Sequence, residues 1–225
     1  MRENLTRVIE DYLKTIYDLT ASGERASTNQ IAERMDVTPA SVTNMIQKLA
    51  ETQPPLLDYR KHRGVKLTPE GEKVALEIIR HHRLLEMFLH QTLGYSWDEV
   101  HEEADRLEHV ISEEMEERIA ASLGNPQYDP HGDPIPTRDL HLPESDEISL
   151  SQLRPPQEAR VKRVRDSDPD LLRYLSEMGI EPASHLAILE YSPFDNNIKV
   201  QIEGKSSPVV LGPRVTNQVF VEVIS

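Results

Sequence analysis

Histidine and carboxylate side chains concentrate between residues 82 and 109, a stretch that holds four of the nine histidines in the chain. His82 and Glu86 are four residues apart in a predicted helix, so both side chains leave the same helical face and can share one cation. On a second predicted helix, Asp105, Glu108 and His109 have i, i+3, i+4 spacing and can also converge. Imidazole and carboxylate groups are common ligands of divalent metal ions. The stretch is therefore interpreted as a metal-binding region.

The spacing indicates two metal sites rather than one. His101 and His109 are eight residues apart, which is roughly 12 Å along a helix with a rise of ~1.5 Å per residue. A ligand atom, in contrast, lies only ~2.0–2.6 Å from its ion. One site is predicted around Asp105, Glu108 and His109. The other is predicted where His101 meets His82 and Glu86 from an antiparallel neighbour. The alternative is a solvated acidic helix face. Because the residues form two interlocking clusters, the metal-site interpretation is favoured over this alternative.

Composition limits the other kinds of chemistry. The chain of 225 residues contains no cysteine, which excludes disulfides, thiolate metal centres and cysteine nucleophiles and fits a reducing cytoplasm. No apolar run of about 18 residues occurs, and no basic and apolar leader is found at the first residues, so we expect neither a membrane span nor a signal peptide. A cytoplasmic, soluble protein of several small domains is predicted.

The net charge of −14 is unevenly distributed. Residues 1–75 carry 11 basic and 11 acidic side chains, residues 76–145 carry 5 and 16, and residues 146–225 carry 9 and 12. A neutral first segment with local basic clusters can still face DNA, while bound cations can partly neutralise the acidic centre.

The first segment has the pattern of a helix-turn-helix. Apolar residues recur at a helical period over residues 6–19, and a second, short helix is predicted from a capping box of Ser27 and Gln30. Thr38 and Pro39 then begin a third helix. The alternative is a helical hairpin that packs only against protein. In a DNA-binding role the third helix would offer asparagine and glutamine to adenine, small methyl groups to thymine and a lysine to phosphate. Its exposed residues would be Thr38, Pro39, Ala40, Ser41, Thr43, Asn44, Gln47 and Lys48.

Residues 56–67 predict a β-hairpin with a basic tip. Arg60, Lys61, Arg63 and Lys66 fall within seven residues, which makes this the densest positive cluster in the first half of the chain. Such a cluster suits contacts to phosphate that do not depend on base sequence. Residues 1–75 are therefore predicted to form a winged helix-turn-helix DNA-binding domain.

Two long helices are predicted next, over residues 69–92 and 96–123, with Ser96 and Glu99 as a capping box for the second. Their apolar surface exceeds what a small monomer can cover, so part of it is expected to form a two-fold dimer. A dimer would place two recognition helices on a palindromic double-stranded site. Residues 76–145 are thus predicted to be the metal-binding and dimerisation domain.

Seven of the sixteen prolines lie between residues 125 and 156, which indicates a linker. Short strands are predicted at residues 161–164, 186–191, 198–202, 209–211 and 219–224, with one small helix at 171–178. Several short strands with little helix are typical of a small closed barrel. Residues 146–225, which complete the linker and contain this barrel, hold no recognisable catalytic constellation.

Three motifs together resemble the diphtheria-toxin-repressor family of metal-dependent transcription regulators. They are the winged helix, the His-x3-Glu pair of His82 and Glu86, and the segment Val-His-Glu-Glu-Ala-Asp-Arg-Leu-Glu-His-Val at residues 100–110. Residues 132–136 also match the Gly-x-Pro-Ile-Pro segment of that family. The resemblance spans the whole chain. It implies a mainly α protein with a C-terminal SH3-like β-barrel similar to FeoA, an iron-transport accessory protein.

The resemblance also implies metal ligands at matching positions of this chain. The primary site corresponds to Asp11, Asp105, Glu108 and His109. The ancillary site corresponds to His82, Glu86 and His101. The ligands of the third domain fall near Asp168, which could serve, and Leu171, which cannot, so Asp166 or Asp170 would substitute.

The ligand types resemble the manganese-responsive branch of the family. Asp11 and Asp105 stand where the iron-responsive branch has methionine and cysteine. Lys14, however, stands where compact manganese repressors have a second glutamate, which argues against a closely coupled pair of manganese ions. The implied cofactor is Mn²⁺, with Fe²⁺ as the alternative. Zn²⁺, Co²⁺, Ni²⁺ or Cd²⁺ would also occupy these sites in vitro.

The expected function is a cytoplasmic, homodimeric repressor that binds a palindromic operator when it is loaded with metal and controls metal-uptake genes. One alternative is an iron-responsive repressor of the same family. Another is a helical dinuclear-metal enzyme, but such enzymes favour Glu-x-x-His repeats on paired helices, whereas Glu108 and His109 are adjacent. A third alternative is a DNA-binding protein whose affinity for DNA does not depend on metal. No enzymatic activity is expected.

Overall fold

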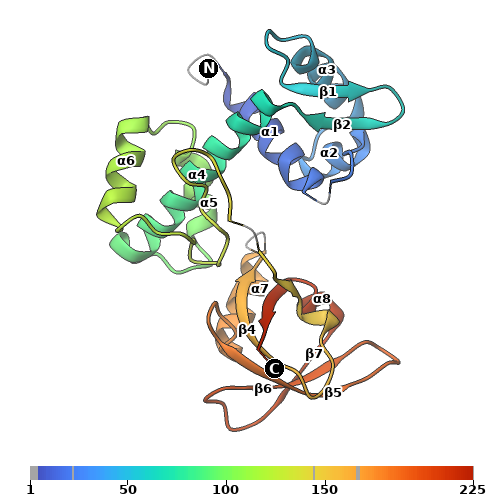
Figure 1. The fold of residues 1–225 in the computed structure, drawn as a ribbon, viewed down its shortest axis with the longest axis vertical. Helices are drawn as coiled ribbons and strands as arrows, with labels where there is room; N and C mark the ends of the chain where they lie inside the picture. Colours follow the sequence, from blue (N-terminus) through green and yellow to red (C-terminus); the bar gives the residue numbers. More distant parts are fainter. Residues whose placement is uncertain (1–4, 22, 144, 166–167, 225) are drawn as a thin grey trace. The chain divides into compact units, whose positions relative to one another are not determined.

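The first helix forms where apolar side chains recur at a helical period. In the computed structural model, which describes residues 5–21, 23–143, 145–165 and 168–224, α1 (Arg7–Thr20) buries Ile9, Tyr12, Leu13 and Ile16. It packs against α2 (Thr28–Arg34) and the hairpin that follows α3 (Pro39–Ala50). Figure 1 shows these three helices in blue beside the hairpin. Their shared core confirms the predicted winged helix.

The two short helices begin at the predicted caps. The side-chain oxygen of Ser27 accepts a hydrogen bond from the Gln30 amide at 3.2 Å, and the Gln30 side chain accepts one from the Ser27 amide at 2.8 Å. The Thr38 hydroxyl accepts from the Ser41 amide at 3.2 Å. Asp36 adopts the left-handed conformation, with φ of 51°, in the turn between the helices. Each cap satisfies an amide that the helix leaves without a partner.

The wing consists of β1 (Leu57–Arg60) and β2 (Gly64–Leu67), which pair in antiparallel register. Arg60 lies opposite Gly64, so residues 61–63 form the tip. Gly64 has φ of +90°, and a Cβ there would lie 2.5 Å from the Ala26 carbonyl oxygen. Glycine is required at this position because both the backbone conformation and the space exclude a side chain.

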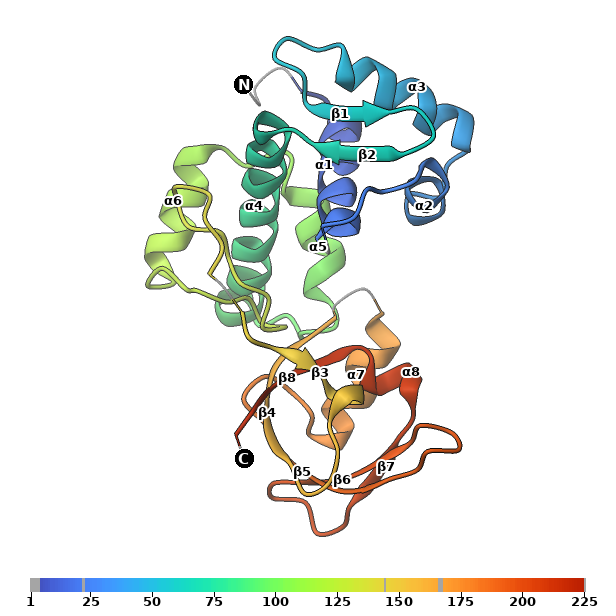
Figure 2. The same cartoon turned by 45° about the vertical axis from the view of Figure 1, so that its right-hand side comes forward.

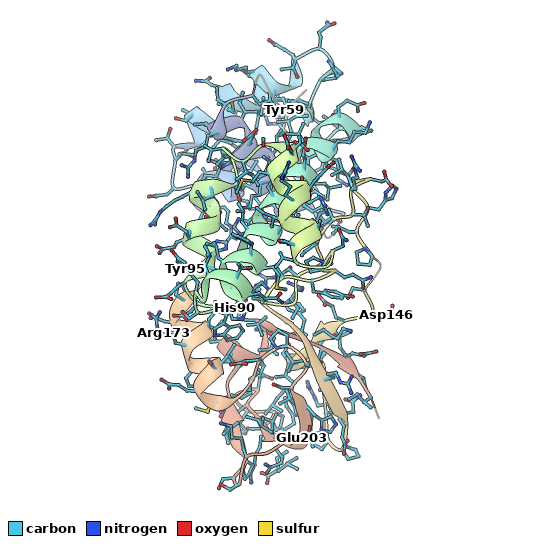
Figure 3. All side chains as sticks on the ribbon, turned by 90° about the vertical axis from the view of Figure 1, so that its left-hand side faces the viewer. Tyr59, His90, Tyr95, Asp146, Arg173 and Glu203 are labelled. Carbon is cyan, nitrogen blue, oxygen red and sulfur yellow. The ribbon has the colours of Figure 1, made fainter. Side chains whose placement is uncertain are left out.

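The long helix α4 (Pro69–Leu93) is confirmed at close to its predicted length. Gly94, with φ of +75°, follows its end. His90 and Tyr95 are labelled near this end in Figure 3, and a ring nitrogen of His90 lies 2.9 Å from the Tyr95 carbonyl oxygen.

The single helix predicted over residues 96–123 is wrong. The chain instead forms α5 (Val100–Leu107) and α6 (Glu113–Ser122), with a turn between them. The Glu108 carbonyl accepts a hydrogen bond from His81 at 3.2 Å, and the Ser112 hydroxyl caps α6 by accepting from the Met115 amide at 3.2 Å. Glu108 and His109 therefore lie in a turn, and the distance estimated from a helical rise does not apply to His109.

The proline-rich segment is folded between residues 127 and 135. Tyr128 bridges Pro134, and the Asp129 side chain accepts hydrogen bonds from the amides of His131 and Asp133 at 2.8 and 2.9 Å. Gly132 has φ of +90°, and a Cβ there would lie 1.9 Å from the Lys162 carbonyl oxygen. Part of the predicted linker is thus a closed loop with a defined geometry.

The C-terminal strands are β3 (Ile148–Ser149), β4 (Glu158–Val164), β5 (His185–Tyr191), β6 (Ile198–Ile202), β7 (Val209–Leu211) and β8 (Val219–Val223). They form one antiparallel sheet in the order β3-β8-β4-β5-β6-β7. The sheet curls on itself (Figure 2). The core of this domain includes Leu150, Val161, Leu172 and Val200. The curled sheet forms the predicted small SH3-like β domain. Among the described residues no ladder pairs β3 with β7, so hydrogen bonds do not close the barrel between these two strands. The other elements of this domain are η2 (Leu150–Gln152), α7 (Pro169–Met178) and α8 (Pro213–Thr216).

The chain divides into two compact units. One contains residues up to 81 together with 108–111 and 136–141, and the other contains residues 82–107, 112–135 and those from 142 onward. None of the helices in the described ranges is both long and apolar enough to cross a membrane.

Candidate metal centres and nucleic-acid interface

The first candidate metal centre joins α1 to the turn after α5. His109 Nε2 lies 2.9 Å from Asp11 Oδ1 and 3.3 Å from Glu108 Oε1. These three residues each offer a ligand atom, and the atoms lie within 4.8 Å of one another. Glu10, which the sequence analysis did not identify, places Oε2 at 2.6 Å from His109 Nδ1. In the sequence, only its position next to Asp11 indicated a role for Glu10 at this centre.

The electrostatic balance of this centre depends on two cationic groups. Burial alone would lower the pKa of His109, but hydrogen bonds to Asp11 and Glu10 and the charge of Glu108 raise that pKa to about 9. The Lys14 ammonium lies 2.9 Å from Glu108 Oε2, and the Glu108 side chain is only 1% exposed. Three carboxylates around one imidazole can therefore hold a cation, provided that His109 loses its proton.

The second candidate centre lies between α4 and α5. His82 Nε2 is 2.9 Å from Glu86 Oε1, and His101 Nδ1 is 3.1 Å from the same oxygen. The two imidazole rings meet edge to face, with centroids 4.8 Å apart. The structure thus brings together the three residues that the spacing assigned to the ancillary site.

Asp105 is directed toward this second group. One of its oxygens lies 3.3 Å from His82 Nδ1, and the other lies 3.7 Å from His101 Nε2. Asp105 and His101 are one turn apart on α5, whereas the helix ends before Glu108. The helical spacing in the sequence grouped Asp105 with Glu108. Because α5 ends at Leu107, this spacing alone does not establish the grouping, and a role for Asp105 in the primary site stays a prediction.

A third group of possible ligands adjoins Glu86 on its other side. Glu86, Asp129 and His131 are buried, and each contributes an atom to a cluster of possible metal ligands. His131 Nε2 donates to the Trp97 carbonyl oxygen at 2.6 Å, and His131 Nδ1 lies 3.8 Å from Glu86 Oε2. Asp129 Oδ2 lies 3.7 Å from Arg83 Nε. Both carboxylate oxygens are buried and have no partner within hydrogen-bonding distance. A cation would coordinate both oxygens.

Burial and nearby charges shift the pKa values of the two carboxyl groups of this cluster in opposite directions. Burial raises the pKa of Glu86, but the charge of His82 and hydrogen bonds from nearby histidines outweigh it, so the pKa is well below its usual range. Burial, together with the charge of Glu86, holds the pKa of Asp129 well above its usual range, although Arg83 partly offsets this. Asp129 and His131 were not predicted as ligands, because they lie in a segment interpreted as a linker. Their closeness in the sequence was the one indication of a metal site that this segment offered.

Asp168, the possible third-domain ligand, caps α7. Its Oδ1 accepts hydrogen bonds from the amides of Asp170 and Leu171 at 3.1 and 3.2 Å. Asp170 pairs with Arg173, and Asp166 lies outside the described residues. Within the described ranges, no cluster of three possible metal ligands includes Asp168.

The predicted recognition helix presents a polar face. Thr43 is half-buried, and its hydroxyl donates to the Pro39 carbonyl oxygen at 2.9 Å, while the Ser41 and Thr38 hydroxyls lie 3.0 Å apart. The buried stripe of α3 consists of Val42, Ile46 and Leu49. The exposed residues of the predicted face are Thr38, Pro39, Ala40, Ser41, Asn44, Gln47 and Lys48.

The wing tip is basic and exposed at Arg60, Lys61 and Arg63. Lys66, in contrast, donates to the Gly23 carbonyl oxygen. A hollow of about 360 Å³ separates the wing from the start of α2. Tyr59, labelled in Figure 3, lies on β1 beside this hollow. Other residues that line this hollow were not predicted to contact DNA; they include Arg25, Ser27, Thr28, Asn29 and His62.

Three family models match successive parts of the chain. Residues 4–65 match the N-terminal DNA binding domain of iron dependent repressors, and residues 68–137 match their metal binding and dimerisation domain. Residues 148–223 match the FeoA domain.

Whole-chain relatives agree with these matches. The iron-dependent repressor IdeR of Mycobacterium tuberculosis (strain ATCC 25618 / H37Rv) is 32% identical over 98% of this chain and 99% of the relative. A solved structure described as a manganese-dependent transcriptional repressor complex with manganese is 40% identical, with a TM-score of 0.87 over 96% of this chain and 99% of that chain. The crystal structure of ScaR with bound Zn2+ is 34% identical, with a TM-score of 0.81 over 95% and 98%.

Proposed function

Because this chain belongs to the iron-dependent repressor family of metal-dependent, DNA-binding transcriptional repressors, we propose that it responds to Mn²⁺ and represses genes for metal-ion uptake. Its candidate metal centres offer only oxygen and imidazole donors, which suit Mn²⁺ better than thiolate and thioether donors would. The solved repressor structure described with manganese is 40% identical to this chain, which supports the same choice. Iron response is the alternative within the family.

One observation supports metal control most directly. Asp11 lies in the segment that matches the DNA-binding model, whereas Glu108 and His109 lie in the segment that matches the metal-binding model. Their ligand atoms nevertheless lie within 4.8 Å of one another. A cation held by these residues would link the first helix of the winged helix to the metal-binding domain. Such a link would favour one orientation of the recognition helix, which is how a ligand shifts a conformational equilibrium.

The proposed ligand sets follow the clusters. The first would use Asp11, Glu108 and His109, with Glu10 beside them and Asp105 as the ligand implied by resemblance. The second would use His82, Glu86 and His101. The buried cluster of Glu86, Asp129 and His131 supports extending this set to His131. When bound, the cation supplies positive charge and fixed coordination; the side chains supply selectivity and position.

The protein would act in the cytoplasm as a homodimer on palindromic double-stranded DNA. The exposed faces of α3 and the wing tip support two kinds of contact, to base edges and to phosphates. We propose a regulatory rather than an enzymatic role, because the chain belongs to a family of transcriptional repressors.

The test is DNA affinity as a function of free metal. The metal-free protein and its Mn²⁺, Fe²⁺ and Zn²⁺ forms are titrated with an operator selected from random duplexes. We expect Mn²⁺ to increase affinity at free concentrations available in cells, although Zn²⁺ binds more tightly in vitro. Activation by Fe²⁺ at much lower free concentration than Mn²⁺ would reassign the metal. Affinity independent of every metal would instead indicate a constitutive DNA-binding protein.

A further inference from the structure

Lys14 engages the same carboxylate that the proposed metal site needs. Its Nζ atom lies 2.9 Å from Glu108 Oε2 and 3.2 Å from Oε1, so the ammonium donates to both carboxylate oxygens. Lys14 follows Asp11 by three residues on α1, which places both side chains on the same helical face. Helix α1 thus carries one proposed metal ligand, Asp11, together with the ammonium group of Lys14, which pairs with a second proposed ligand, Glu108.

A divalent ion and the ammonium cannot both occupy this position without strong repulsion. A metal ion on Glu108 would lie ~2.0–2.3 Å from a carboxylate oxygen, only about 4 Å from an ammonium hydrogen-bonded to the same group. Like charges at that distance repel, especially where Glu108 is 1% exposed and water screens little. The Lys14 side chain is 20% exposed, and its flexible four-carbon stem can carry the ammonium into solvent.

From this geometry we infer that Lys14 is a built-in competitor of the metal ion at Glu108. It weakens metal binding and thereby raises the free-metal concentration at which the site fills. The inference rests on the proposed metal response and adds a residue that sets its threshold. A lysine that merely positions Glu108 would predict the opposite effect, because its removal would then weaken metal binding.

The test compares uncharged and charged replacements of Lys14 in the full-length protein. Lys14→Gln and Lys14→Met remove the ammonium, whereas Lys14→Arg keeps a positive charge. Lys73→Met is the matched control, since Lys73 is exposed and pairs with Glu70, at 3.5 Å, rather than with a proposed ligand. The control changes net charge by the same amount, so it measures the general electrostatic effect on cation binding.

Two measurements separate the Glu108 site from the second centre. Free Mn²⁺ measured by electron paramagnetic resonance reports total binding. Fluorescence of Trp97, the single tryptophan, reports the second centre, because its ring stacks on His131 with centroids 5.8 Å apart. We expect Lys14→Gln and Lys14→Met to tighten Mn²⁺ binding at the Glu108 site about two- to fivefold, which corresponds to the loss of a partly exposed ion pair. Lys14→Arg and Lys73→Met should bind as wild type does.

A second readout is the melting temperature with and without Mn²⁺. Without metal, Lys14→Met should melt lower than wild type because Glu108 loses a counter-charge; with saturating Mn²⁺ the difference should shrink. Unchanged or weaker Mn²⁺ binding in both uncharged variants would overturn the inference, as would equal tightening in Lys73→Met. If wild type itself binds no Mn²⁺ at Glu108, with Glu108→Gln having no effect on stoichiometry, then the proposed function fails instead.

Discussion

At the residue scale, His109 is both a proton carrier and a proposed metal ligand. Its pKa of about 9 exceeds the ordinary value of 6.5, so the folded protein holds this proton more tightly than the unfolded chain does. The stabilisation is fully present below about pH 6.5 and is lost as the pH rises toward 9. A cation would compete with this proton, because only the neutral imidazole can bind metal.

The metal-free protein should therefore lose stability between pH 6.5 and 9. Urea unfolding at several pH values in this window measures the effect. The loss should be smaller in His109→Gln, which has no proton to release. His62→Gln serves as the control, since His62 is exposed at the wing tip, and it should follow wild type. A wild-type curve with the same slope as His109→Gln would mean that the raised pKa of His109 does not contribute to folding.

At the scale of elements, α3 and the wing differ in what they can offer to DNA. The exposed Asn44 of α3 has an amide suited to a base edge, whereas the wing tip carries three exposed cations. Phosphate contacts act on every duplex and depend on salt, but base contacts discriminate between sequences.

Replacing Arg60, Lys61 and Arg63 together with alanine should weaken binding to all duplexes. The slope of log affinity against log salt should fall by up to about 3, since each phosphate contact contributes roughly 0.9. Asn44→Ala should instead cost about 1–3 kcal/mol on the selected operator and little on random DNA. Fluorescence anisotropy over a salt series checks both, with Lys73→Ala as the control. Equal losses on operator and random DNA in both variants would remove the assignment of α3 as the recognition helix.

At the scale of the whole molecule, the question is how metal binding changes the affinity for DNA. Asp11 belongs to the same helix as the buried core residues Leu13 and Ile16 of the winged helix. A ligand at Asp11 therefore acts on a rigid element rather than on a loose loop. In the proposed mechanism, loss of this one carboxylate removes the link between metal and the winged helix without disrupting either core.

Asp11→Ala should accordingly fold and still bind metal at the second centre, but gain no DNA affinity from it. A coupling of ~1–3 kcal/mol corresponds to roughly a 5- to 150-fold gain in wild type, which the variant would lack. His82→Ala should show a milder, partial defect. Operator binding is measured for each protein at matched free Mn²⁺, and sedimentation checks that the oligomeric state is unchanged. An undiminished metal-dependent gain in Asp11→Ala would refute the mechanism.

The sequence by itself determined the elements of the winged helix and the pairing of His82 with Glu86. Caps such as Ser27 with Gln30, and the i, i+4 spacing within one helix, are local features, so a short window contains all the information needed to predict them. The resemblance of residues 100–110 to a known family likewise depends only on residue order.

Only the tertiary structure decided where the remaining side chains meet. The turn between α5 and α6 is held by a contact that is distant in sequence, because His81, 27 residues from Glu108, donates to the Glu108 carbonyl group. The Ser112 cap was the local signal for a new helix. The same fold brings Glu10 to His109, and it directs the Asp129 loop to Glu86. These are contacts between residues far apart in the chain, and burial of the whole core, rather than the propensity of any one segment, sets their geometry.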